Sequence, residues 1–146
     1  MALDSEIHNN GHRFILLATT TITTAVTNVA TTPVLKLSGM AYLLVQAVFV
    51  YGSGGTTAKV WVQTSIDGVK WADIINIPFT TASSVQMGVA SLYSSALTAP
   101  VVTTDGSSAD NTITNGVLGN QVRLKYTTTG TYGGSTTLAV IGTAKS

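Results

Sequence analysis

The sequence predicts an all-β protein: a single β-sandwich, jelly-roll-like or Ig-like, of about 8–10 short antiparallel strands with an N-terminal arm. Short stretches of alternating apolar and polar residues recur along the chain, separated by clusters of Gly, Asn, Asp and Ser. The 25 threonines favour strands, because a side chain branched at Cβ suits extended backbone. No stretch shows the apolar period of a helix.

The beginning of the chain is polar and follows neither the helical nor the strand period. We therefore divide the chain into an arm (residues 1–13) and a sandwich domain (residues 14–146). Within the arm, His8, His12 and Arg13 are candidate residues for docking on a partner.

Several strands are expected in the first third of the sandwich: residues 14–24, 26–32 and 34–38, with Pro33 as a boundary. Residues 41–51 (AYLLVQAVFVY) are almost continuously apolar. Such a run is typical of a central strand that is covered on both faces. Residues 52–55 then form a glycine-rich loop.

The most informative stretch covers residues 58–74, which predict a strand, a tight turn at Asp67-Gly68 and a returning strand. Glycine adopts positive φ without a steric penalty, so Asp-Gly is a strong hairpin signal. Trp61 and Trp71 lie on the two arms of this hairpin. Pro78 is expected to end the returning strand.

The last third of the chain continues the same pattern. Residues 97–103 contain Pro100 and predict an edge strand or a connection, and residues 104–111 (TDGSSADN) are turn-forming throughout. Further strands are expected at residues 85–93, 112–118, 121–127 and 135–144.

The composition excludes several classes of protein. Charged residues make up 9% of the chain, well below the roughly 25% of a typical domain, and the net charge is +1. Scattered Lys and Arg residues give no reason to expect nucleic acid or a membrane surface as a partner. The apolar stretches are too short to span a membrane, and the N-terminus lacks the features of a signal peptide. The absence of cysteine excludes a disulfide scaffold and thiol chemistry.

No residue pattern indicates catalysis, a cofactor or a metal. The two histidines lie in the arm, where Gly11 argues against a helix that would align them for metal binding. Asp67 and Asp105 each precede a glycine, where aspartate makes turns for local reasons. We therefore expect a protein that is not an enzyme and carries no cofactor.

Trp61 and Trp71 leave one alternative open. If their rings were exposed they could stack on sugars, and the chain would be a carbohydrate-binding module with a surface glycan as its partner. A tryptophan on a hairpin more often packs across strands or over a core, so we interpret both as fold anchors.

The hairpin also carries a resemblance. Residues 62–74 (VQTSIDGVKWADI) resemble the QTS-x-DG-x-x-W-x-D hairpin of small β-sandwich proteins of tailed bacteriophages. Asp105-Gly106, residues 109–112 (ADNT) and residues 116–138 (GVLGNQVRLKYTTTGTYGGSTTL) are similar to segments of phage structural proteins. The similarity covers about residues 58–143.

This resemblance implies a virion structural protein, with no enzymatic residues to carry over. Capsid decoration (cement) proteins are similar in size, in sandwich architecture and in carrying a terminal arm. They imply the major capsid protein and copies of the chain itself as partners, in a virion assembled in the host cytoplasm. Tail-tube and head–tail joining proteins are an alternative, but they usually include a helix, which this sequence does not predict.

Overall fold

Eleven β-strands make up the regular structure of the chain in a computed structural model that describes residues 12–32, 34–37, 39–93 and 97–146. No helix occurs in these ranges. The strands are β1 (His12–Thr21), β2 (Val26–Ala30), β3 (Leu35–Lys36), β4 (Tyr42–Val50), β5 (Ser53–Gly54), β6 (Thr57–Ser65), β7 (Ala72–Phe79), β8 (Ser84–Ser91), β9 (Gln121–Thr129), β10 (Tyr132–Gly133) and β11 (Thr137–Lys145).

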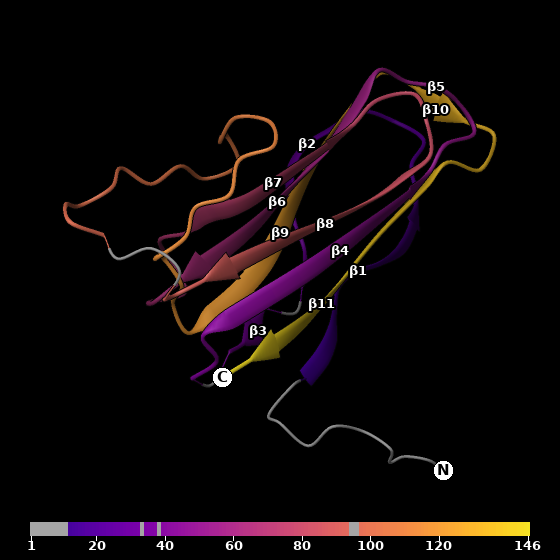
Figure 1. Cartoon of the computed structure of the whole chain (residues 1–146). Coiled ribbons are helices and arrows are strands. Elements are labelled where there is room, and N and C mark those ends of the chain that lie inside the picture. The colour runs from indigo at the N-terminus through magenta and orange to yellow at the C-terminus, as the bar shows by residue number, and fades with distance from the viewer. Residues whose placement is uncertain (1–11, 33, 38, 94–96) are drawn as a thin grey trace, which may run out of the picture.

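The strands pair antiparallel in two main sheets that lie face to face (Figure 1). Sheet A has the order β1-β11-β4-β8. Sheet B has the order β2-β9-β6-β7, and β3 also pairs with β9. A short sheet of β5 and β10 lies at one end of the sandwich. The predicted all-β sandwich is confirmed.

The pairing is nested around the turn at residues 66–71. β6 pairs with β7, β4 with β8, β2 with β9, and β1 with β11. The chain is therefore one long antiparallel ribbon whose successive pairs alternate between Sheet B and Sheet A. This connectivity is that of a jelly roll, which decides between the two sandwich types that the sequence left open.

The core lies between the two sheets and follows the period-two alternation of the strands. In β4, for example, Leu43, Val45, Ala47 and Phe49 point inward and are buried. Each fully buried aliphatic or aromatic side chain contributes about 1.5–3 kcal/mol to folding. The core side chains with almost no exposed surface also include Val60, Val62, Ile74, Ile75, Val122, Leu124, Leu138 and Val140.

The structure differs from the expectation about which strand is covered on both faces. β4 was expected to be covered on both faces, but its outward side chains are half-buried or exposed. β6, whose sequence alternates, is buried on both faces from Val60 to Ser65. The second cover over β6 comes from residues 97–120, which lie between β8 and β9, far from β6 in sequence, and which we call the covering loop.

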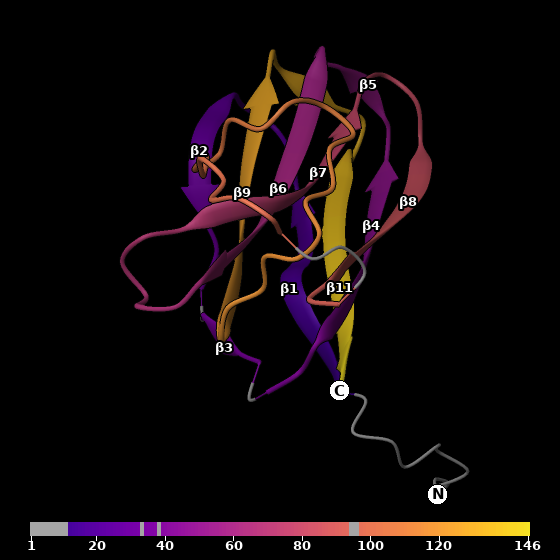
Figure 2. The same ribbon diagram turned by 60° about the vertical axis from the view of Figure 1, so that its left-hand side comes forward.

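This loop crosses the outer face of Sheet B (Figure 2). Part of it runs beside β7, where the backbone N–H groups of Asp73 and Asn76 donate to the carbonyls of Thr104 and Thr112 at 2.8 Å each. The loop therefore occupies hydrogen-bonding groups at the edge of Sheet B that a bare edge strand would offer to another chain.

Three details of the sequence-based assignment are corrected. The strand expected at residues 112–118 reduces to one isolated bridge between Ile113 and Ile75, because the segment belongs to the covering loop. Pro78 does not end β7 but lies inside it, opposite Lys59; β7 is the last strand of Sheet B, where a proline is tolerated. β1 already begins at His12, so the last two residues of the predicted arm belong to the sandwich.

Candidate functional site

Both tryptophans are buried, each with 6% of its surface exposed. Trp61 lies on β6, and its Nε1–H donates to the carbonyl of Ser108 at 3.1 Å. Trp71 directly precedes β7, and the Cζ atom of Arg123 lies 4.2 Å from its ring centroid. Neither ring belongs to the core between the sheets; both lie on the side of Sheet B where the loop crosses. The hydrogen bond of Trp61 holds that loop, and the burial of both rings leaves neither available as a stacking platform for sugars.

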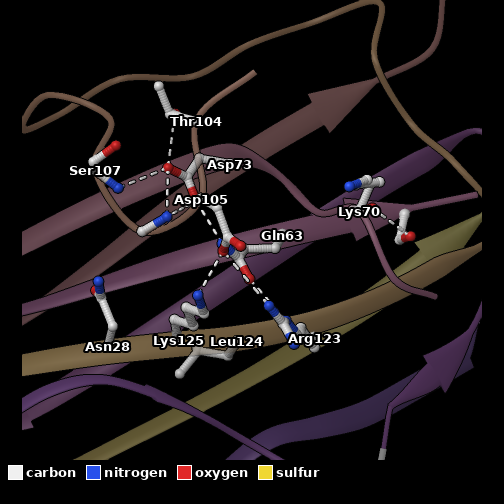
Figure 3. A network of polar contacts seen from close by, with 12 residues as sticks. Asn28, Gln63, Lys70, Asp73, Thr104, Asp105, Ser107, Arg123, Leu124 and Lys125 are labelled. Carbon is white, nitrogen blue, oxygen red and sulfur yellow. Dashed lines mark hydrogen bonds and ion pairs between the residues drawn. The ribbon is translucent and has the colours of Figure 1, made fainter.

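Asp73 is the centre of a polar network on this face (Figure 3). Its side chain is buried, with 6% of the residue exposed. Its carboxylate accepts hydrogen bonds from the backbone N–H groups of Gly106, Ser107 and Ser108 at 2.8–3.0 Å and from the Thr104 hydroxyl at 2.8 Å. Successive backbone N–H groups that converge in this way form an anion-binding concavity. Here the protein's own carboxylate fills it.

Gln63 connects this carboxylate to a second charged cluster. Its Nε2 donates to Oδ1 of Asp73 at 2.8 Å and to Oδ1 of Asp105 at 2.7 Å, and its Oε1 accepts from Nε of Arg123 at 2.8 Å. Nζ of Lys125 lies 2.6 Å from the same Asp105 oxygen. Burial, the largest single influence, raises the pKa of Asp105, but the contacts with Lys125, Gln63 and Arg123 outweigh it and lower the pKa overall.

This network holds the loop in place and is poorly arranged for chemistry. A general base or nucleophile must be reachable by a substrate, whereas both oxygens of Asp73 are already filled by protein donors. The Gln63 amide also separates Asp73 from Asp105. Sequence reasoning missed this arrangement because it assigned Asp105 to a local turn. The signal was the short run Asp-Gly-Ser-Ser at residues 105–108, whose small side chains let successive N–H groups converge.

The predicted turn at Asp67-Gly68 is present, but it is wider than the expected tight hairpin, because β6 ends at Ser65 and β7 begins at Ala72. Oδ1 of Asp67 accepts hydrogen bonds from the backbone N–H groups of Val69 and Lys70 at 2.8 Å, and Gly68 has φ +75°. Both bonds lower the pKa of Asp67, and the bond from the Lys70 N–H has the larger effect. Asp67 therefore has a local structural role.

A pocket of about 490 Å³ opens where this turn meets the covering loop. Ile66, Trp71, Leu92, Leu97 and Leu118 contribute apolar side chains to its wall. Three apolar side chains that line it are exposed, and we call this group the hairpin-end surface: Ile66, Leu92 and Leu97.

A second, largely apolar surface lies on the outer side of Sheet A, and we call it the Sheet A face. Its members alternate with the core residues of β1, β11, β4 and β8. They are Arg13, Ile15, Tyr42, Leu44, Gln46, Val48, Val50, Val85, Met87, Val89, Thr137, Ala139, Ile141, Thr143 and Lys145. No carboxylate belongs to this set.

Of the three candidate docking residues near the N-terminus, the structure describes His12 and Arg13. His8 lies outside the described residues. His12 and Arg13 belong to β1, opposite Ala144 and Thr143 of β11, and Arg13 is exposed. Arg13 thus lies at one end of the Sheet A face, which gives it a place on a strand and not on a separate arm.

Other kinds of site find no support within the described ranges. They contain no group of three or more metal-binding side chains, and no helix there is long and apolar enough to cross a membrane. Comparison with known proteins finds no matching family model, no similar curated protein and no similar solved structure.

Proposed function

We propose that this chain is a structural component of a phage particle: a capsid decoration protein that stabilises the head by bridging capsomers. It acts through protein–protein contacts with the major capsid protein and with copies of itself, in a virion assembled in the host cytoplasm. One observation supports this best: the jelly roll exposes apolar side chains at two surfaces, the Sheet A face and the hairpin-end surface.

Two contact surfaces are what a bridging protein needs, because it must hold at least two neighbours at once. On the Sheet A face, Met87 and Ile15 are each 58% exposed; on the hairpin-end surface, Ile66 is 80% exposed. Contiguous exposed apolar patches on a soluble protein mark interaction sites or aggregation liabilities. Burial against neighbours in a shell would remove that liability.

The distribution of charge supports the same role. The chain has 13 charged residues, seven basic and six acidic. Arg123 and Lys125 both pair with Asp105 and are themselves mostly covered, and Asp73 is buried under the loop, so these three charges do little to hydrate the surface. A surface so poor in free charge is a solubility risk for an isolated monomer and suits a protein that works inside an assembly.

The proposal is tested by quantitative mass spectrometry and cryo-EM of particles from the phage that encodes the chain. Many copies per head, arranged on the capsid surface, are expected. Absence from purified particles would contradict any virion role. One ring of copies at the tail or the portal would instead identify the tail-tube or head–tail joining alternative.

A binding experiment isolates the contact itself. Purified protein is added to heads that lack it, and bound protein is measured after sedimentation. Ile66→Glu should reduce binding at least about tenfold, since a buried unpaired charge costs more than 1.4 kcal/mol. Val102, which is 97% exposed on the covering loop, supplies the matched control as Val102→Glu. Equal binding by both variants would exclude the hairpin-end surface from the contact with the head.

A further inference from the structure

We propose that the Sheet A face is the surface through which two copies of this chain associate, packed sheet against sheet around a twofold axis that runs across the strands. This inference rests on the proposed function in one respect: it assigns one of the two bridging surfaces to a second copy and leaves the hairpin-end surface for the head.

The register of Sheet A arranges the outward-facing residues in rows, half-buried on β4 and β11 in the middle of the sheet and exposed on β1 and β8 at its edges. The middle row runs across all four strands as Ile15, Ile141, Gln46 and Met87. The next row is Arg13, Thr143, Leu44 and Val89. On the other side of the middle row, Ala139, Val48 and Val85 lie side by side. The three rows together hold a single charge, that of Arg13.

The composition of β4 indicates that this face is covered in the working protein. β4 and its flanks read AYLLVQAVFVY, the pattern of a strand buried on both sides, yet the single chain buries one side only. In Sheet B the cover over the outer face comes from the chain's own loop. Val85, Met87 and Val89 on neighbouring β8 are 60%, 58% and 46% exposed, so no described segment of the chain covers them.

The size of the face matches what a specific dimer needs. Four strands about 4.8 Å apart and eight residues long, at about 3.3 Å per residue, span roughly 500 Å² of flat area. Two copies would bury about twice this, near 1,000 Å², and corrugation by side chains adds to it. Specific interfaces begin at about this area. Two flat sheet faces can also pack about 10 Å apart with interdigitated side chains, as in a sandwich.

Charge determines how the two copies are oriented. Arg13 and Lys145 lie at one end of the face, and Val50 and Thr137 at the other. An axis parallel to the strands would stack the basic ends on each other, which is unfavourable between like charges. An axis across the strands places each basic end over the neutral end of its partner. The middle row, including Gln46 and Met87, then faces its own copy.

The first test measures mass in solution by sedimentation equilibrium over a concentration series. The 146-residue chain should give twice its 15.1 kDa mass. Met87→Glu should weaken the dimer at least about tenfold, because two copies of the new carboxylate would face each other in an apolar contact. Val102→Glu is the matched control and should leave the dimer unchanged. Circular dichroism checks that each variant folds.

The second test does not depend on a destabilising substitution. The chain has no cysteine, so Met87→Cys provides a single thiol close to the proposed axis. Mild oxidation should convert this variant to a disulfide-linked dimer, whereas Ile66→Cys on the hairpin-end surface should stay uncrosslinked at the same concentration.

The outcomes separate this inference from the proposed function. A wild-type chain that stays monomeric up to millimolar concentration, or a dimer that Ile66→Glu breaks and Met87→Glu spares, overturns the inference. So does a monomer that loses binding to heads on Met87→Glu, since the capsid would then occupy this face. If the chain forms the proposed dimer but is absent from virions, the decoration role is contradicted and the inference about the Sheet A face stands.

Discussion

Substituting Asp73 by asparagine should release the covering loop from Sheet B. The substitution keeps the shape of the side chain but removes its charge and replaces one acceptor oxygen with an NH₂ donor. Oδ2 of Asp73 accepts from three successive backbone N–H groups and from the Thr104 hydroxyl. An amide that turns its oxygen toward these groups must aim its NH₂ at Gly106 and Gln63, which also donate.

The magnitude follows from these contacts. Either orientation of the amide leaves at least two donors without the charged acceptor that they have in the wild type. Hydrogen bonds to charged groups contribute about 1.5–3 kcal/mol each, so Asp73→Asn should reduce the free energy of unfolding by about 3–6 kcal/mol. This is a large part of the 5–15 kcal/mol typical of a domain, so the variant should be marginally stable.

Urea denaturation followed by fluorescence of Trp61 and Trp71 measures this loss, and hydrogen exchange at Ser107 and Ser108 localises it. Asp110→Asn is the control: Asp110 pairs with Lys59 at 2.8 Å, but the pair is partly exposed, so its loss should cost less than about 1 kcal/mol. The reasoning is refuted if Asp73→Asn costs no more than Asp110→Asn.

Three further outcomes are expected. The pKa of Asp105 is lowered from its ordinary 3.8, so its contribution to stability is present above that pH and is lost as the pH falls through the lower, folded-state value. When the pH is lowered from about 5 to about 2, the urea midpoint should therefore fall less for Asp105→Asn than for wild type. Gly55→Ala should lower the urea midpoint strongly, by about 2 kcal/mol or more, because Gly55 has φ +64° and a Cβ there would lie 2.2 Å from the Tyr132 ring. Leu124→Ala should cost about 2–5 kcal/mol in the same assay, since Leu124 has no exposed surface; a loss below 1 kcal/mol would mean that the core is looser than described.

Local patterns were enough to predict the strands that alternate cleanly. The segments expected at residues 121–127 and 58–65 correspond to β9 and β6, and the Asp67-Gly68 turn lies where its chemistry placed it. Such predictions succeed because side-chain alternation and glycine φ are properties of neighbouring residues. The assignment of Trp71 as a fold anchor agrees with its burial, although the cover differs from the expected sandwich core.

Features that depend on distant residues could not be predicted in this way. The polar run at residues 104–111 has no periodicity, yet it covers Sheet B and binds Asp73 through its backbone N–H groups. Almost every residue has such a group, so the sequence gives no sign of this contact. The apolar run of β4 led to the opposite error, the prediction of a cover that the single chain does not supply. A strand whose outer face a second chain could cover has the same kind of sequence as a strand covered by its own chain. The nested order of strands likewise depends on pairings between opposite ends of the chain.

The nested pairing also implies an order of folding. If β1 and β11 met first, the chain would close a loop of nearly its full length, whereas β6 and β7 meet across a short turn. Closure entropy grows with loop length, so the lowest-cost route zips from the turn outward: β6–β7, then β4–β8, β2–β9 and finally β1–β11. Pulse-labelled hydrogen exchange should show β1 amides protected last; early protection there would contradict this order. β1 contributes Ile15 to the Sheet A face, so that face would be completed in the final step, and a partial fold would lack the complete surface through which copies associate.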